Sequence, residues 1–482
     1  MPEPVASAWN MRDAERSLGE ELDRLGHVLG PLGERFRAAG HELHLVGGPV
    51  RDALLGRTVT DLDLTTSARP EEIERLVSGW AEATWDIGRA YGTIGLRRGD
   101  WHIEITTYRS EAYDPQSRKP EVNYGESLVG DLGRRDFTVN AMAISVPDRT
   151  FTDPFGGVVD LAHRRLRTPG RPEDSFSDDP LRMMRAARFA AQLGFEVAPE
   201  VVAAMKAMVD RIGIISAERI RDELVKLVCA PYPRRGLTLL VETGLADHVL
   251  PELPALMLER DEHHRHKDVY EHSMTVLEQA IDQEDRLGGG PDFVVRFAAL
   301  MHDVGKPRTR RFLDDGSVTF HHHDVVGAKL TRKRMKALRF SGETIDAVAK
   351  LVELHLRFHG YGDGGWTDSA VRRYVRDAGD QLERLHILTR ADCTTRNRRK
   401  AEQLRRTYDD LEARIARLSE QEELASIRPD LDGNAIMEIL GIPPGRDVGA
   451  AYDYLLELRM EEGPLGEEEA TRRLLAWWAD RD

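Results

Sequence analysis

The sequence contains very little cysteine, since Cys229 and Cys393 are its only thiols among 482 residues. A disulfide framework of the kind that stabilises small secreted proteins is therefore excluded, and the reducing cytoplasm is the expected compartment. No stretch approaches the roughly 18 consecutive apolar residues that a membrane-spanning helix needs, and residues 1–20 contain no apolar segment typical of a secretory signal. We therefore expect no membrane partner.

Positive charge is also in deficit, because 83 acidic residues outweigh 68 lysines and arginines and give a formal net charge of −15. This balance argues against indiscriminate binding to nucleic acid. It leaves room for a local basic surface, since lysines and arginines gather at residues 329–339 and 396–406. Either run is also typical of a solvated helix face. No internal repeat and no low-complexity segment occurs.

The chain is too long for one hydrophobic core, and about two to four domains are expected. A mixed α/β pattern occupies the first third of the sequence, after which apolar residues follow the helical period of 3.6. The elements we expect are an amphipathic helix over 12–40, a strand at 44–46, a helix that opens at Pro70, strands at 93–96 and 101–106, helices over 177–251 and 262–400, and a charged helix over 409–418.

The most informative motif joins Gly47, Gly48 and Arg51 to the pair Asp61 and Asp63. Residues two apart on an extended segment point to the same face, so the two carboxylates can hold a pair of Mg²⁺ ions. The glycines let backbone N–H groups approach a polyphosphate, and Arg51 offers a planar guanidinium to its oxygens. An Asp-x-Asp pair alone is usually a turn or a solvated strand end. The glycine-rich element at this spacing favours a nucleotidyltransferase head with two metal ions.

Two further polar clusters follow along the chain. In the first, Arg135 suits phosphate oxygens, while Asp136 and Asn140 can hydrogen-bond a ribose. An N-capped helix with a solvated basic end explains this cluster equally well. In the second, Asp179 and Arg182 lie three residues apart and are expected as neighbours on one helix face. There they can hydrogen-bond a base edge, although an ordinary ion pair also fits this spacing.

These three segments, in this order, resemble the bacterial-type (class II) tRNA CCA-adding enzyme and poly(A) polymerase family over about residues 25–255. The resemblance implies a head of the DNA polymerase β superfamily and a helical neck that selects the nucleotide without a nucleic-acid template. It implies that Asp61 and Asp63 bind the catalytic Mg²⁺. The nucleotide-binding residues that it implies are Gly47, Gly48, Arg51, Arg135, Asp136, Asn140, Asp179, Arg182, Arg185 and Arg188.

The resemblance also implies separate roles within that set. Asp136 would read the ribose 2′-OH, and Asp179 and Arg182 would pair with the incoming C or A. Arg185 and Arg188 would brace the helix that carries Arg182. A later segment at 216–220 resembles a family block that supports the neck.

Two further acids, at positions 178 and 104, lie outside the set of residues that the resemblance implies. The family commonly has Glu-Asp before the selecting arginine, whereas this chain has Asp178 and Asp179. The shorter side chain at 178 shifts a group that flanks the base. Glu104, on the expected strand 101–106, is either a third acid near the metals or a plain surface glutamate.

A second site is indicated where His302 and Asp303 follow the apolar run 297–301. Imidazole and carboxylate groups are suitable ligands for Zn, Mn, Fe, Ni or Mg. Residues 265–400 resemble the HD phosphohydrolase superfamily, in which a metal can activate water against a phosphoester. The ligands that the resemblance implies are His272, His302, Asp303 and Asp392, with His323 and His355 as candidate additional ones. The histidines without a matched role, which we expect at the surface, are His263, His264, His266, His321 and His322.

We therefore expect an α+β multidomain protein with a mixed-sheet, polymerase-β-like head. Its expected segments are an N-terminal helix (1–40), the head (41–165), a helical neck and body that selects nucleotide and binds RNA (166–255), an all-helical HD domain (262–400) and a helical tail (401–482). The expected function is addition of C, C and A to tRNA 3′ ends from CTP and ATP, with HD phosphohydrolase activity left open. The alternatives are a poly(A) polymerase and an HD phosphohydrolase with an inactive RNA-binding head.

Overall fold

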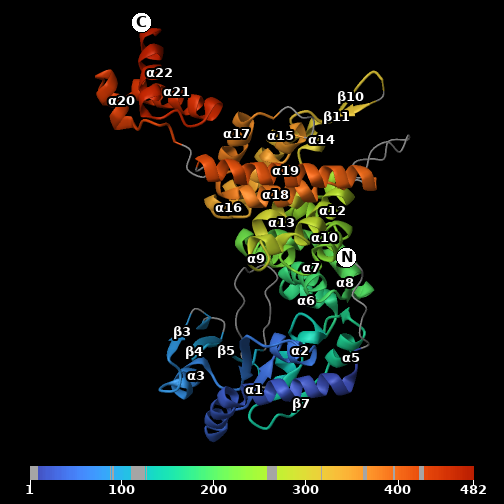
Figure 1. Cartoon of the computed structure of the whole chain (residues 1–482). Helices are drawn as coiled ribbons and strands as arrows, with labels where there is room; N and C mark the ends of the chain where they lie inside the picture. The colour runs from blue at the N-terminus through green and yellow to red at the C-terminus, as the bar shows by residue number, and fades with distance from the viewer. Residues whose placement is uncertain are drawn as a thin grey trace. The chain divides into compact units, whose positions relative to one another are not determined.

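The computed structural model describes residues 9–481 apart from 87, 90–91, 110–124, 126, 258–268, 316, 362–365, 395–396 and 423–427. His263, His264, His266 and Arg396 lie outside the described residues. The chain divides into two compact units, Met1–Val249 and Leu250–Asp482 (Figure 1). Among the helices of the described residues, none is long and apolar enough to cross a membrane.

The first unit is built on a mixed seven-stranded sheet with the order β3-β4-β5-β2-β1-β6-β7. Strands β2 and β5 are parallel, and the other neighbours are antiparallel. The expected strands are present, but β3, β6 and β7 escape sequence analysis because two or three residues are too few to show alternation. The strands are β1 (Leu43–Val46), β2 (Asp61–Thr66), β3 (Ala83–Trp85), β4 (Thr93–Arg98), β5 (Trp101–Thr107), β6 (Ala143–Ser145) and β7 (Phe151–Thr152).

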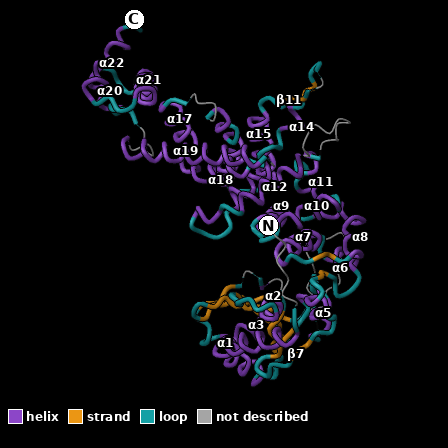
Figure 2. The backbone as a smooth tube through the Cα atoms, turned by 45° about the vertical axis from the view of Figure 1, so that its right-hand side comes forward, coloured by secondary structure: helices purple, strands orange, loops and turns teal. Residues whose placement is uncertain are grey.

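Short helices flank this sheet, together with the long N-terminal helix that the sequence predicts. That helix buries an apolar stripe that includes Leu25, Leu32 and Phe36, none of which is exposed to solvent. Figure 2 shows the strands gathered in this part of the chain, among helices. The helices are α1 (Met11–Ala38), α2 (Gly48–Leu54), α3 (Pro70–Val77), α4 (Leu128–Gly133), the 3₁₀ turn η2 (Thr138–Asn140) and α5 (Gly157–Ala162).

The rest of the first unit is a helical neck with a small parallel sheet of β8 (Arg165–Leu166) and β9 (Glu196–Val197). Helix α7 is its centre, and most of its residues are buried. Gly236 allows the close packing of α10 on α7, because a Cβ atom there would lie 2.4 Å from the carbonyl oxygen of Ala187. The helices are α6 (Pro172–Asp178), α7 (Leu181–Leu193), α8 (Pro199–Met208), η3 (Val209–Ile214), α9 (Ala217–Val228), α10 (Pro233–Glu242) and α11 (Leu245–Val249).

The second unit is helical within its described residues apart from one short hairpin, β10 (Arg311–Phe312) with β11 (Val318–Thr319), so the HD segment is not all-helical as expected. Its central helix α13 carries the apolar run of the HD segment and is buried from Val295 onward. The helices up to α18 are η4 (Pro254–Leu256), α12 (Val269–Ile281), η5 (Glu284–Leu287), α13 (Phe293–Met301), α14 (Lys306–Thr309), α15 (His323–Ala337), α16 (Gly342–Leu354), η6 (Arg357–Gly360), α17 (Asp368–Ala378), η7 (Gly379–Gln381) and α18 (Leu382–Ala391).

Helix α19 (Arg398–Glu422) is longer than the charged helix expected over 409–418, and it runs through residue 400, the expected boundary between the HD domain and the tail. Beyond it, α20 (Gly433–Leu440), α21 (Arg446–Glu462) and α22 (Glu467–Ala479) enclose a small core of their own that includes Ile436, Leu455 and Leu474. The expected α+β fold, with a mixed-sheet head followed by helices, is therefore confirmed. The division into five segments remains a proposal.

Candidate functional site

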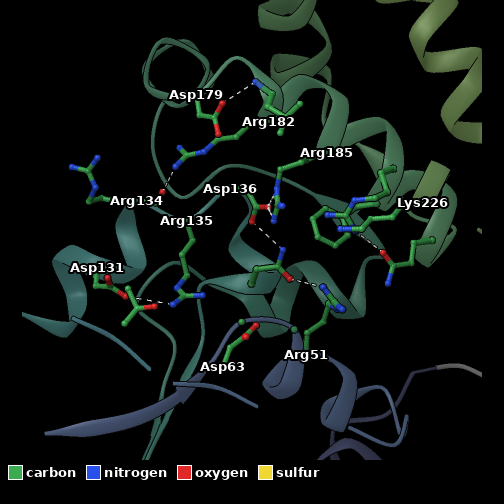
Figure 3. Close-up of a pocket in the computed structure, with 18 of the residues that line it drawn as sticks. Arg51, Asp63, Asp131, Arg134, Arg135, Asp136, Asp179, Arg182, Arg185 and Lys226 are labelled. Atoms are coloured by element: carbon green, nitrogen blue, oxygen red, sulfur yellow. Dashed lines mark hydrogen bonds and ion pairs between the residues drawn. The ribbon is translucent and has the colours of Figure 1, made fainter. Parts of the chain in front are cut away.

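A polar cleft of about 700 Å³ opens in the first unit, lined by β2, α2, α7, α9 and the loop after α4. In Figure 3, Arg51 and Asp63 lie at one side of this cleft and Asp179 and Arg182 at the other. The residues that the family resemblance implies for Mg²⁺ or nucleotide binding all line it, namely Gly47, Gly48, Arg51, Asp61, Asp63, Arg135, Asp136, Asn140, Asp179, Arg182, Arg185 and Arg188.

The acid pair of the cleft lies on one face of β2, where Asp61 and Asp63 alternate with buried neighbours. The parallel pairing of β2 with β5 sets Glu104 directly beside Asp63. Although Asp63 reaches the open cleft, protein surrounds it on its other sides. This burial raises the pKa of Asp63, and the nearby Glu104 and Asp61 carboxylates raise it further against the opposing charge of Arg135. The surplus of negative charge fits a divalent cation.

The glycine-rich turn between β1 and α2 leaves room for an arginine. Gly47 has a φ of +73°, and a Cβ atom there would lie 2.9 Å from Nη1 of Arg135. Glycine is therefore required both by the backbone conformation and by the neighbouring guanidinium. Arg51 is 3% exposed; it pairs with Asp52, and its Nη1 donates to Oδ1 of Asn140 at 2.6 Å. Its guanidinium thus already faces two protein partners.

Asp136 ties the head loop to helix α7. Its Oδ2 accepts a 2.7 Å hydrogen bond from Nε of Arg185, and its Oδ1 accepts bonds from the Asn140 side chain and the Phe137 backbone N–H. Burial alone would raise the pKa of Asp136, but Arg185 and Asn140 lower it below the ordinary value. The carboxylate is therefore ionised, and both of its oxygens have protein partners.

A buried glutamate on α9 connects the arginines of α7. Glu223 is 4% exposed, and its Oε2 lies 2.5 Å from Nε of Arg188, with Arg185 nearby at 3.7 Å. Arg188 also stacks over the Phe189 ring at 3.9 Å. Sequence analysis missed Glu223. Its signal was a charged residue on the apolar stripe of α9, beside Leu224.

The expected placement of Asp179 and Arg182 on one helix face is wrong, and so is the ordinary ion pair between them. Asp179 is extended (φ −144°, ψ 101°) and precedes α7, because the proline after it disfavours the helical conformation. Its Oδ2 pairs with Nη2 of Arg219 at 2.7 Å. Arg182, on α7, donates from Nη1 to Oγ of Ser175 at 2.9 Å. Both side chains nevertheless line the cleft.

In the second unit the expected metal ligands come together in two groups that share Asp303. Within each group the ligand atoms lie within 4.8 Å of one another. Asp392 joins them, since its Oδ1 lies 2.9 Å from Nε2 of His272. His321 and His322 are exposed, as the sequence predicts. The first group is His272, His302 and Asp303, and the second is Asp303, His323 and His355.

The ring orientation of three of these histidines suits metal binding. In His302, His323 and His355 the Nδ1 atom lies 2.6–2.8 Å from a backbone carbonyl oxygen three residues earlier. A carbonyl only accepts, so Nδ1 carries the hydrogen and Nε2 presents its lone pair to the cluster. Burial, reinforced by His302, lowers the pKa of His355 to about 4, which keeps its ring neutral at pH 7. These residues fit a divalent metal.

Three family models match successive parts of the chain. They are the Poly A polymerase head domain at residues 43–167, the probable RNA and SrmB-binding site of polymerase A at 194–257, and the HD domain at 269–397.

Two curated relatives match to different extents. The CCA-adding enzyme of Levilactobacillus brevis is 43% identical over 227 residues, which cover 47% of this chain and 56% of that enzyme. The match thus spans about half the length of this relative. The A-adding tRNA nucleotidyltransferase of Deinococcus radiodurans is 34% identical over 442 residues, which cover 90% of this chain and 95% of that enzyme.

Solved structures match over almost the whole chain. The Bacillus stearothermophilus CCA-adding enzyme in complex with CTP has a TM-score of 0.69 at 25% identity, and the match covers 95% of this chain and 98% of that one. The Thermotoga maritima CCA-adding enzyme complexed with tRNA shares the fold, with a TM-score of 0.60 at 20% identity over 96% and 98% of the two chains. With the match to the Deinococcus enzyme along nearly its full length, the chain belongs to the tRNA nucleotidyltransferase family with a poly(A) polymerase-type head, as its sequence predicts.

Proposed function

We propose that this protein adds C, C and A to the 3′ end of tRNA, with CTP and ATP as its substrates. The observation that carries the proposal is the single cleft in which an acid pair, a set of arginines and the pair Asp179 and Arg182 converge. The names of the similar enzymes support the same reaction. The cytoplasm is the compartment we propose, because Cys229 and Cys393 are both free thiols.

In this proposal Asp61 and Asp63 hold Mg²⁺, with Glu104 beside them as a third acid. Bound Mg²⁺ would lower the charge of the triphosphate and assist attack by the terminal 3′-OH on the α-phosphate, with pyrophosphate as the leaving group. Arg135 lies against the Gly47 turn, where it can neutralise phosphate oxygens. Arg51 and Asn140 hold each other in place, and Asp136 fixes α7 through Arg185.

Base selection is proposed for Asp179 and Arg182. A carboxylate accepts from the exocyclic amino group that C and A share and that U lacks, while a guanidinium donates to a ring nitrogen. Both groups are held from behind, Asp179 by Arg219 and Arg182 by Ser175. Because both side chains are held rigidly, they can select the base directly, without a nucleic-acid template.

A second candidate is addition of the terminal A alone, since the relative that matches along nearly its whole length is an A-adding enzyme. Two tRNA substrates separate the candidates, one that lacks all three terminal nucleotides and one that ends in CC. A CCA-adding enzyme extends both, with C incorporated only into the first. An A-adding enzyme extends only the second. A poly(A) polymerase would instead add a long tail to either.

For the second unit we propose a phosphohydrolase centre with one or two divalent ions, Mg, Mn, Ni, Fe or Zn, held by the groups that share Asp303. A bound ion would polarise the phosphoester and the attacking water. Hydrolysis of a 2′,3′-cyclic phosphate adds one water across one P–O bond and leaves a phosphomonoester and a hydroxyl group. The test is hydrolysis of this substrate by chelator-treated protein reloaded with each ion. Reloaded protein that stays inactive with every ion would make the centre structural.

A further inference from the structure

Part of the segment between the metal ligands Asp303 and His323 forms an arm, which we define as residues 306–315 and 317–320 and which contains β10 and β11. Among the described residues these two strands pair only with each other. A lone two-stranded hairpin gains little stability by itself. Figure 1 shows the hairpin projecting from the neighbouring helices of the second unit. The arm therefore adds little to the core, and its surface chemistry needs another explanation.

The arm carries unpaired positive charge. Within its described residues, Arg308, Arg310 and Arg311 have no carboxylate within ion-pair distance, whereas Arg334 on α15 binds Glu252 at 2.8 Å. Of the two acids at the tip, Asp315 is occupied with the turn, because its Oδ1 accepts from the backbone N–H and the hydroxyl of Ser317. Unpaired arginines in a chain with a net charge of −15 mark a surface for a polyanion.

Aromatic and apolar side chains stand among these arginines. Phe312 is 65% exposed and Leu313 is 47% exposed, and the Arg310 guanidinium lies 4.6 Å from the centre of the Phe312 ring. Phe320, at the other end of the arm, is half-buried and lies 5.8 Å from Nζ of Lys306, so Phe312 is the exposed ring. Exposed rings interleaved with cations bind unpaired bases by stacking and the backbone by charge. Bases inside a double helix are not accessible in this way, so a single strand is favoured.

Both ends of the arm start at the metal-ligand cluster. At one end, Nζ of Lys306 lies 2.7 Å from Oδ2 of Asp303. At the other, the carbonyl oxygen of Phe320 accepts from Nδ1 of His323 at 2.8 Å. Two residues of extended chain, about 7 Å, separate Phe320 from Val318, the strand partner of Phe312. An RNA strand whose bases stack on the arm therefore has its end within reach of the metal-ligand cluster.

We propose that the arm binds single-stranded RNA and delivers its 3′ end to the HD centre. The arm thereby directs an RNA terminus to that centre, and the 2′,3′-cyclic phosphate proposed for the centre serves as the test substrate. This inference rests on the phosphohydrolase function proposed for the centre. A free mononucleotide reaches the same ligands without using the arm, and this difference makes the proposal testable.

The test compares the full chain with two arm variants. One carries Arg308→Ala, Arg310→Ala and Arg311→Ala together, and the other carries Phe312→Ala. The matched control removes three arginines of the first unit that are paired with carboxylates, through the substitutions Arg16→Ala, Arg75→Ala and Arg97→Ala. Two measurements are made: hydrolysis of a 2′,3′-cyclic mononucleotide and of a twelve-nucleotide RNA with the same terminus, and RNA affinity by fluorescence anisotropy at several salt concentrations.

Both arm variants should raise KM for the RNA roughly tenfold or more and leave mononucleotide hydrolysis unchanged. In the triple variant the slope of log affinity against log salt should fall by about 2, or about 0.7 for each lost contact. The control should behave as the wild-type protein. If the wild-type protein shows no hydrolase activity but the arm variants bind RNA more weakly, the arm proposal is supported. The phosphohydrolase function proposed for the centre is then wrong. Unchanged RNA affinity and KM, or equal loss of hydrolysis on both substrates, would each overturn the arm proposal.

Discussion

Nε of Arg185 donates a 2.7 Å hydrogen bond to Oδ2 of Asp136, and this bond joins the helix that carries Arg182 to the loop that carries Arg135. The two residues are 49 positions apart in the sequence. The carboxylate is almost fully buried, so loss of its partner would leave an uncompensated charge in the cleft. Base selection on α7 and phosphate contacts in the head are therefore expected to be coupled.

This coupling predicts non-additive losses. Asp136→Asn and Arg185→Ala should each lower the catalytic efficiency of nucleotide addition by about tenfold or more, because each breaks the same link. The double variant should be little worse than the poorer single variant. The measurement is kcat/KM for CTP and ATP in a double-mutant cycle. Losses that simply multiply would show that the two residues act separately.

The acid pair should be indispensable for chemistry. Asp61→Ala or Asp63→Ala should abolish nucleotide incorporation and leave tRNA affinity nearly unchanged, because both carboxylates are needed to hold two metal ions. Incorporation rates and tRNA binding are measured on the same preparations. A variant that keeps more than roughly a tenth of the wild-type rate would remove the residue from the metal site, since a lost ligand costs several kcal/mol of transition-state stabilisation.

Arg182 should set the choice of base. Arg182→Ala should relax the preference for C and A over U and G, because the base loses a directional donor. Single-nucleotide incorporation with each of the four nucleotides gives the ratios. If the variant loses activity equally with all four, Arg182 has a structural role, which its bonds to Ser175 and the Arg134 carbonyl would explain.

The glycine turn offers a matched pair of substitutions. Gly47→Ala forces an alanine into the left-handed region, at a cost of roughly 1–2 kcal/mol, and pushes against Arg135. KM for the nucleotide should rise several-fold. In Gly48→Ala the new Cβ atom meets Nη2 of Arg51 at 3.6 Å, an ordinary contact, so its KM should change much less. Equal effects of the two substitutions would contradict the role given to the Gly47 turn.

The two metal sites should act independently. The double variant His302→Ala with Asp303→Ala should keep nucleotide addition and lose phosphohydrolase activity. Added metal at about 100 times its Kd should stabilise the wild-type second unit by about 2.7 kcal/mol, and this gain should be absent from the variant. Thermal unfolding with and without a chelator measures it. A folded double variant that no longer adds nucleotides would show that the HD segment supports the head reaction.

The sequence predicts those parts of the sites whose residues lie close together along the chain. Asp61 and Asp63 share a strand face by alternation alone, and their convergence with the neck residues follows from the family resemblance. Partners from distant elements are not visible in this way: Glu223 and Arg219 come from α9, which reaches α7 only through the packing of the neck. Asp303 belongs to both ligand groups only because α12 and α16 pack on α13 and α15 packs on α16.

The error at Asp179 has a local cause. A spacing of three residues predicts a shared helix face only if one helix includes both positions, and Pro180 separates α6 from α7. The short strands β3, β6 and β7 are set by their neighbours in the sheet, since two or three residues carry no pattern of their own. Each forms by pairing with a neighbour, β3 with β4, β6 with β1 and β7 with β6, and this pairing is not visible in the sequence.

The central claim is tested most directly with a tRNA that lacks its three terminal nucleotides, incubated with CTP and ATP and resolved one nucleotide at a time. The account predicts products that grow by C, C and A and then stop, with no growth in the Asp63→Ala variant. A single added A, an extended adenylate tail, or no incorporation by the wild-type protein would contradict it.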